Sequence, residues 1–425
     1  MAIKFTNDMT KISRAPVNIY FFLFFWFWWL VVWLNIFFFR IIFFKSLKSF
    51  FKKLFFPNRK KSIFYLEVFS PESAGNRHRT KKWVEILNQN NFKVRSAYVF
   101  EYREYLQLTS SENTMPFFLM SFMWIRFWQI MRSSFCDVIV VRRELLMFND
   151  YGNLFFEKLL ASLHSVRVLD FDDDISAAKR EPKTISSFGK MLLEHPKKFS
   201  ASLKHYTHFF PATNYLRDLL KQSFPSAKDE NILVLPTCVD YNSSQKKNYN
   251  SLSDEIVIGW VGARNNLGNL HLVVNALNWL SSKYKFRLRV VCDAPFAVPV
   301  LFPVESIRWS EKFEIENLLS IDIGIMPLEN SLEQKGKAAF KLIQYMGLGI
   351  VSMATALTVN TEVIDDGVNG FLVSPDADWN AYFEKVFQQR NQFAEIGARA
   401  KTKIEMNSSF AANQQRLLNF FQSIK

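Results

Sequence analysis

The stretch that decides the predicted fold runs from Gly336 to Val373 and reads GKAAFKLIQYMGLGIVSMATALTVNTEVIDDGVNGFLV. Its opening predicts a helix with Lys337, Lys341 and Gln344 at i, i+4 and i+7, which places two cations and an amide on one helix face. Two glycines then end the helix, and residues 350–354 read as a short buried strand. Because free N–H groups at a helix start favour an anion, the pattern predicts a bound diphosphate of the nucleotide type.

A second candidate phosphate-binding turn, GWVGARNNLG, occupies residues 259–268 and follows a predicted strand. It is neither GxGxxG nor GxxxxGKS/T, so it is neither a dinucleotide fingerprint nor a Walker loop. The turn contains Gly262 and carries Arg264 at its tip. With the two lysines of the first stretch, Arg264 predicts a cationic clamp on a leaving diphosphate.

Strand and helix patterns alternate from residue 62 onward, which predicts parallel sheets covered by helices on both faces. The predicted strands are 63–66, 94–100, 138–141, 166–171, 208–211 and 232–235 in a first series, then 256–261, 288–291, 321–326, 350–354 and 371–373 in a second. A polar run at 241–255 reads as a linker between the series. We therefore predict an α/β protein with two Rossmann-like domains, 62–240 and 256–425, that face a cleft.

An uncharged run of 23 residues from Val17 to Phe39 dominates the N-terminal region. At about 1.5 Å per residue, a helix of this length crosses roughly 30 Å of hydrocarbon. We expect residues 1–44 to form a tail and a membrane-anchor helix, and residues 45–61 to form a basic juxtamembrane linker. An anchor that lies in the membrane plane with the same orientation is the alternative.

The positive charge of the chain is concentrated beside this run. Residues 1–61 contain eleven Lys or Arg and one Asp, a net charge of +10 out of +14 for the whole chain. This distribution favours a membrane surface as partner and argues against nucleic acid. Three cations precede the apolar run and seven lie between residues 45 and 61, so the positive-inside rule places the large C-terminal part in the cytoplasm.

A second apolar stretch, MPFFLMSFMWIRFWQIM, spans residues 115–131 and is interrupted by Arg126. It is too short and too charged to predict a membrane span. Two interpretations remain open, a core helix of the first domain and an amphipathic helix that faces a membrane.

The acidic run from Asp170 to Asp174 ends a predicted strand and allows three interpretations. A D-x-D pattern can hold a divalent metal together with a nucleotide-sugar. One of its carboxylates can instead act as a base or bind sugar hydroxyls. The third interpretation is helix capping and ion pairing with nearby arginines. No second cluster of carboxylates or histidines accompanies the run in sequence, so we expect neither a metal nor a cofactor.

These residues carry a family resemblance. Residues 62–406 resemble the GT-B glycosyltransferases of family 4, the "glycosyl transferases group 1" type, most strongly over 256–373. The matching segments are FKLIQYMGLGIV (340–351), similar to the family's KLLEYMAAGxPVV, then DIGIMPL (322–328), DGVNGFLV (366–373), SPESAGNRHR (70–79) and the stretch 169–175, similar to a DFDDxI motif. The two glutamates of the family's E-x7-E motif would fall near Gly336 and on Gln344, so neither is present.

The resemblance implies a retaining sugar transfer from a nucleotide-sugar to a glycan or lipid-linked acceptor, for example of the cell envelope, without an obligatory metal. The second domain would bind the donor and the first the acceptor. The implied donor-side residues are Gly262, Arg264, Lys337, Lys341, Gln344 and Glu362, with Arg264 and Lys341 as the catalytic cations on the leaving diphosphate. The candidate acceptor-side residues are Gly75, Asn76, Arg77, Arg79, Asp172 and Asp173.

Two alternatives stand beside this hypothesis. A GT-B-fold epimerase of nucleotide-sugars would need an acid/base pair in the cleft and would give a product of altered sugar configuration. A membrane-tethered binding or scaffold protein, suggested by the missing glutamates, would bind a donor without turnover. Release of nucleoside diphosphate only in the presence of acceptor would support the transferase.

The anchor hypothesis predicts the result of a deletion. Removing residues 1–44 deletes the uncharged run, and much of the protein should then leave the membrane fraction when cells are fractionated. Neutralising the seven cations between residues 45 and 61 should weaken attachment or disturb topology. A deleted chain as membrane-bound as the full chain would place the anchor elsewhere, with 115–131 the first suspect.

Overall fold

The computed structural model describes residues 59–71, 73–101, 104, 115–147, 150, 152–174, 197–250 and 253–424. The predicted anchor helix, and the predicted linker up to residue 58, lie outside these ranges. Within them, no helix combines the length and the apolar character that crossing a bilayer requires.

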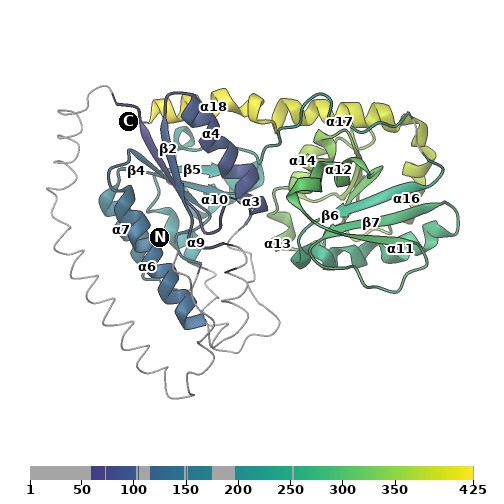
Figure 1. Cartoon of the computed structure of the whole chain (residues 1–425), viewed down its shortest axis with the longest axis horizontal. Coiled ribbons are helices and arrows are strands. Elements are labelled where there is room, and N and C mark those ends of the chain that lie inside the picture. The colour runs from purple at the N-terminus through teal and green to yellow at the C-terminus, as the bar shows by residue number, and fades with distance from the viewer. Residues whose placement is uncertain are drawn as a thin grey trace, which may run out of the picture.

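The first sheet has five parallel strands in the order β2-β1-β3-β4-β5 (Figure 1). They are β1 (Ser62–Leu66), β2 (Lys93–Ala97), β3 (Val138–Arg142), β4 (Val166–Phe171) and β5 (His208–Pro211). Strands β1 and β3 are buried along their whole length, as expected for strands covered on both faces, whereas β2 is largely exposed at the edge. The strand order reverses between β1 and β3, which makes their carboxyl ends a switch point where ligands bind in such sheets.

Helices cover both faces of the first sheet. They are α3 (Ala74–Asn76), a π-helical turn (Arg77–Lys81), α4 (Lys82–Gln89), α6 (Met115–Ser133), α7 (Phe155–Leu163), α9 (Lys198–Leu203), α10 (Asn214–Ser223) and a 3-10 turn (Asp229–Asn231). Alternate residues of β1 divide between two apolar clusters. Ile63 packs with α4, and Phe64 packs with α6, α7 and α9. This division follows from the alternation of side chains along a strand.

The second sheet has six parallel strands in the order β11-β10-β9-β6-β7-β8. They are β6 (Ile256–Val261), β7 (Phe286–Cys292), β8 (Val304–Arg308), β9 (Ile323–Met326), β10 (Val351–Thr355) and β11 (Phe371–Val373). The order reverses between β6 and β9, so this sheet has its own switch point at their carboxyl ends.

The second sheet is also covered on both faces. Its helices are α11 (His271–Ser281), α12 (Glu314–Leu319), α13 (Leu332–Lys335), α14 (Phe340–Gly347), α15 (Thr358–Val363), α16 (Asn380–Gln388) and α17 (Phe393–Asn407), with 3-10 turns at Arg264–Leu270, Glu311–Phe313 and Arg390–Gln392. One apolar cluster joins the sheet to α11 and α16, and the other joins it to α12, α14 and α17.

The last helix, α18 (Phe410–Ser423), returns to the first domain (Figure 1). Phe410 packs against Trp83 of α4 with ring centroids 4.8 Å apart, and the Lys61 ammonium donates to the Phe421 carbonyl at 2.7 Å. The predicted second domain, residues 256–425, includes this helix. The domain boundaries remain predictions, but these contacts attach α18 to the first sheet.

Apart from shifts of up to three residues at strand ends, the predicted elements differ from the structure in three places. The helix expected from Lys337 begins only at Phe340, because Ala339 has a left-handed backbone with φ of 50°. Residues 232–235 do not form a strand and contribute one isolated bridge beside β5. Strand β8 was not predicted, because three of its five residues are polar or charged and all five are at least partly exposed.

One close approach in the second domain predicts a packing result. A Cβ added to Gly324 would lie 2.5 Å from the Tyr345 ring. That ring is fully buried, and its hydroxyl accepts a 2.8 Å hydrogen bond from the Val261 N–H, so it cannot yield freely. Gly324→Ala should lower the free energy of unfolding by about 2 kcal/mol, measured by denaturant titration. Gly268→Ala is the control, because no atom lies within 4 Å of its added Cβ. Equal midpoints for both variants would contradict this packing.

Candidate functional site

The carboxyl end of β6 brings Lys341 against a glycine. A Cβ added to Gly262 would lie 2.7 Å from Cε of Lys341 and 2.7 Å from the Trp260 ring. The Lys341 ammonium lies 5.3 Å from the centroid of that ring, within cation–π range. Gly262 is therefore needed because the lysine and the indole occupy the space of a side chain.

The charge of Lys341 is held in an unfavourable environment. Burial, and to a smaller extent nearby Lys337, lower the pKa of Lys341 to about 8, while Asp173 and Cys292 oppose the shift. Burial also lowers the pKa of Lys337, whose ammonium donates a hydrogen bond to the Asn266 side chain. Two partly desolvated cations of this kind favour an anionic ligand, because its negative charge would stabilise the charged forms of both lysines.

Arg264 does not share this position. Its guanidinium is 67 % exposed and lies 3.8 Å from the Asp293 carboxylate, which also accepts a hydrogen bond from the Arg264 N–H at 2.9 Å. The structure thus brings Lys337 and Lys341 together with Gly262 and leaves the Arg264 side chain at the surface.

Gln344 belongs to a chain of polar contacts that joins the two domains. Its amide donates to Glu314 at 3.2 Å. Both carboxylate oxygens of Glu314 also accept from one guanidinium nitrogen of Arg77, Nη2, at 2.8 and 2.9 Å. Arg77 also stacks over Trp309, 5.3 Å from the ring centroid. Arg77, a predicted acceptor-side residue, therefore contacts the donor-side domain.

Two further contacts cross between the domains. The Asn214 amide donates to exposed Glu362 at 2.9 Å. The Asp174 N–H donates to the Gly336 carbonyl at 3.1 Å, and a Cβ added to Gly336 would lie 2.2 Å from Cβ of Asp174. The position where the family motif has its first glutamate therefore has no room for a side chain in this arrangement.

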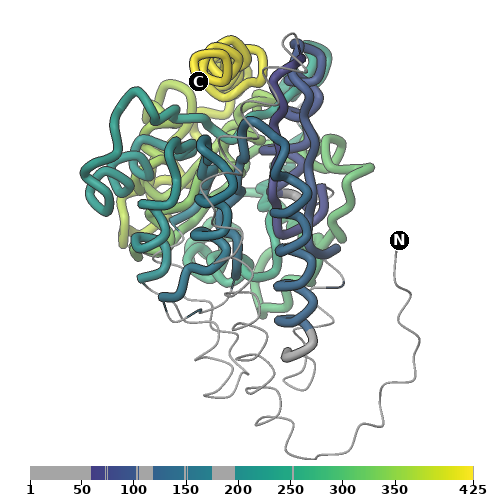
Figure 2. The backbone as a smooth tube through the Cα atoms, turned by 90° about the vertical axis from the view of Figure 1, so that its left-hand side faces the viewer, coloured from purple at the N-terminus to yellow at the C-terminus, as the bar shows by residue number. Residues whose placement is uncertain are grey.

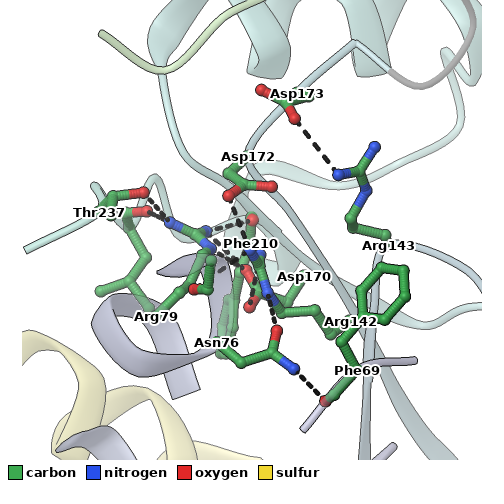
Figure 3. Close-up of polar contacts among 12 residues, drawn as sticks. Phe69, Asn76, Arg79, Arg142, Arg143, Asp170, Asp172, Asp173, Phe210 and Thr237 are labelled. Atoms are coloured by element: carbon green, nitrogen blue, oxygen red, sulfur yellow. Dashed lines mark hydrogen bonds and ion pairs between the residues drawn. The ribbon is translucent and has the colours of Figure 1, made fainter. Parts of the chain in front are cut away.

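The guanidinium of Arg79 has no N–H group left to bind a sugar acceptor. It is 1 % exposed, and its guanidinium donates to Asp170 at 2.7 Å, to the Leu235 carbonyl at 2.8 Å and to the Phe210 carbonyl at 3.1 Å (Figure 3). These bonds tie the π-helical turn before α4 to the ends of β4 and β5. Arg79 therefore has a structural role, and its acceptor-side role stays a prediction.

Asn76 and Gly75 line the same region. The buried Asn76 amide donates to the Phe69 carbonyl and accepts from Arg142 at 3.3 Å (Figure 3). Gly75 is exposed, and an added Cβ there would lie 3.3 Å from the Arg142 guanidinium. Gly75 thus remains accessible, whereas Asn76 is occupied by the fold.

The two aspartates of the D-x-D run face different partners. Asp172 accepts from Arg142 at 2.7 Å; burial alone would raise the pKa of Asp172, but Arg142, Arg143 and Arg79 hold it below its usual range. Asp173 lies 3.4 Å from Arg143, and 42 % of its side chain is exposed. The partial desolvation of this carboxylate, together with the neighbouring Asp172, raises the pKa of Asp173. Ion pairing therefore accounts for Asp172, whereas Asp173 is the exposed carboxylate that acts on Lys337 and Lys341.

Sequence reasoning missed several residues of this region. Trp260 lies in the predicted phosphate-binding turn 259–268, two residues before Gly262, so its position in the sequence could have indicated that it lies at the site. Glu314 and Asn214 gave none, because single polar residues outside a motif are ordinary surface residues until the fold brings them to a partner.

Comparison with known proteins identifies the fold. No protein-family model and no curated protein matches the chain by sequence. The structure resembles a glycosyltransferase from Rickettsia africae (14 % identity, 85 % of this chain and 98 % of that chain, TM-score 0.58). It also resembles sucrose-phosphate synthase from Thermosynechococcus elongatus, with 12 % identity, coverage of 85 % of this chain and 98 % of that chain, and a TM-score of 0.59. A third similar structure is Anabaena HepE in complex with UDP-glucose, with 12 % identity, coverage of 85 % of this chain and 100 % of that chain, and a TM-score of 0.52.

The chain therefore has the GT-B fold, with two parallel Rossmann-like sheets, and this prediction is confirmed. At such identities the likeness establishes the fold and leaves the chemistry to be argued from the residues.

The Arg77–Glu314 pair predicts a coupling between the domains. The two side chains are only 10 and 13 % exposed. A double-mutant cycle with Arg77→Ala and Glu314→Ala, read by denaturant unfolding, should give a coupling of about 2 kcal/mol. The exposed Lys283–Glu384 pair, also at 2.9 Å, serves as control and should give less than about 0.5 kcal/mol. A cycle at Arg77 and Glu314 as weak as the control would show that the domains do not meet there in solution.

Proposed function

We propose that the protein is a membrane-associated glycosyltransferase that moves a sugar from a nucleotide-sugar to a glycan or lipid-linked acceptor. The observation that carries this proposal is Lys341, a lysine with its pKa lowered to about 8, held against Gly262 at the switch point of the second sheet. Membrane association rests on the sequence of residues 1–61, and the catalytic body is then cytoplasmic.

In this mechanism the diphosphate lies on the two lysines. When the bond between the sugar and the diphosphate breaks, negative charge accumulates on the leaving phosphate oxygens. Lys341 and Lys337 are partly desolvated, so their charges act at low effective dielectric and stabilise that charge without reorganisation. Arg264 can add a third cation only after its guanidinium leaves Asp293.

The remaining donor contacts are proposed from the same geometry. Gln344 lacks the charge of the family's glutamate, but its amide lies 3.2 Å from the Glu314 carboxylate. We propose that Gln344 and Glu314 together orient donor hydroxyls, with Glu362 at the edge of the site. Because HepE was solved with UDP-glucose, UDP-sugars are the first donors to test.

For the acceptor side we propose the groups that are accessible in the fold. Gly75 and Asp173 remain exposed near the ends of β1 and β4, whereas Arg79 and Asn76 are occupied. Asp173, with its raised pKa and its proximity to Lys337, is the carboxylate that we place beside the transferred sugar.

A binding protein without turnover is the second candidate, favoured by one observation. The first family glutamate has no room at Gly336, and the second is the neutral Gln344. Incubation of the full chain with UDP-sugars and membrane extracts separates the two candidates. Acceptor-dependent release of UDP supports the transferase, whereas UDP-sugar binding without release supports the binding protein.

Removing the Lys341 cation should slow transfer. Lys341→Ala deletes a charge-assisted contact that strengthens as the leaving group gains charge, so kcat should fall roughly a hundredfold, about 3 kcal/mol. Lys341→Arg should recover only part of the rate, because a planar fork replaces a compact charge. The exposed Lys283→Ala is the matched control and should keep the parental rate. A folded Lys341→Ala protein with the parental rate would refute the site.

Donor binding should depend on pH around the pKa of Lys341. UDP favours the charged lysine, which is fully formed well below pH 8 and is lost as pH rises above it. The affinity for UDP, measured by calorimetry, should therefore fall by up to roughly tenfold per pH unit above pH 8, with proton uptake on binding. Lys341→Arg stays charged and should bind UDP with a flatter profile, in which only the loss of charge on Lys337 remains. A flat profile for the parent protein would contradict the contact.

A further inference from the structure

Helix α6 exposes aromatic side chains and buries a charge. Met120, Trp124 and Trp128, spaced four residues apart, are 37, 53 and 47 % exposed and form what we call the α6 aromatic face. The two indole rings pack edge to face with centroids 5.8 Å apart. Arg126, which lies between them in sequence, is 0 % exposed. This distribution is the reverse of that expected for a helix whose outer face meets water only.

The buried arginine fixes the rotation of the helix. The Arg126 guanidinium donates to the Glu67 carbonyl at 2.7 Å and to the Leu145 carbonyl at 3.0 Å, and a third bond of 2.8 Å goes to Gln129. It also lies 5.5 Å from the Phe122 ring centroid. Because these bonds tie α6 to the ends of β1 and β3, the helix cannot turn to bury its tryptophans without leaving a charge unpaired in the core.

Cations lie at the C-terminal end of the same face. Arg132, the next residue at this spacing, is exposed, and Phe135 just beyond the helix is 66 % exposed. The described end of the basic linker meets the chain here, since Arg59 is ion-paired with Asp137 and Lys60 is exposed. Figures 1 and 2 show α6 along the outside of the first domain.

We infer that the α6 aromatic face docks into the interfacial region of an anionic lipid bilayer. Indole rings prefer the boundary between headgroups and acyl chains, and the exposed cations of Arg132 and Lys60 can pair with anionic headgroups. Residues 1–61 supply the sequence for a second attachment to the same surface, so docking would hold the first domain against the bilayer. The inference concerns a different surface from the predicted anchor and does not depend on sugar transfer.

A probe on the face tests lipid contact directly. The full chain carries Met120→Cys labelled with the fluorophore NBD, and labelling is selective because the three native cysteines are buried. The labelled chain is mixed with vesicles of phosphatidylcholine and phosphatidylglycerol at about 3:1, with or without a spin-labelled lipid. Met406→Cys on α17, 70 % exposed, is the matched control. We expect the spin label to reduce NBD emission at least twofold at residue 120 and not at residue 406.

The tryptophans themselves supply the second test. Trp124→Gln with Trp128→Gln, in the chain labelled at residue 120, should abolish most of the quenching, whereas Leu301→Gln, at a site 80 % exposed in the other domain, should leave it unchanged. Weaker quenching in pure phosphatidylcholine vesicles would support the role of the cations. Equal emission with and without spin-labelled lipid at residue 120, or equal quenching at residues 120 and 406, would overturn the inference. A blue-shifted probe that lipid cannot quench would also overturn it, because a protein segment would then cover the face.

Discussion

The contact between Asp174 and Gly336 is the constraint on which the arrangement of the site depends. The loop after β4 lies so close to the second domain that an added Cβ on Gly336 would be 2.2 Å from Cβ of Asp174. This approach brings the end of the acidic run to the loop that carries Lys337, so that Asp173 raises the pKa of both lysines while burial lowers it. It also explains why a glutamate cannot occupy position 336 in this arrangement.

This arrangement makes the charged forms of Lys337 and Lys341 less stable than they would be in water. Desolvation opposes the charge of Lys341, and neither Asp173 nor the aromatic face of Trp260 restores its usual pKa. A site of this kind is poised for an anion, because a bound diphosphate supplies the compensation that the protein lacks. The Arg77–Glu314–Gln344 contacts connect the second domain to the first through one chain of hydrogen bonds. If Gln344 binds the donor as proposed, donor binding and the relative position of the domains are linked through this chain.

Much of the fold follows from the sequence, because buried parallel strands such as 138–141 and 256–261 are apolar runs bounded by turns. The site was predicted less completely. Lys341 and Gln344 lie on the expected helix, but Lys337 lies before it, because the left-handed backbone of Ala339 makes the helix begin at Phe340. Nothing in the sequence signals this conformation of Ala339. Arg79 resembled a loop cation in sequence, and only its hydrogen bonds to the ends of β4 and β5 reveal a structural role. Long-range pairings of this type depend on the tertiary structure and leave no local pattern.

Hydrogen–deuterium exchange of the full chain with and without UDP tests the central claim most directly, because it reports where a nucleotide diphosphate binds without assuming a sugar or an acceptor. The account predicts that saturating UDP slows exchange in peptides from the 259–268 turn and from 336–347, around Gly262 and Lys341. Unchanged exchange in both segments at saturating UDP, or protection confined to the first domain, would contradict it.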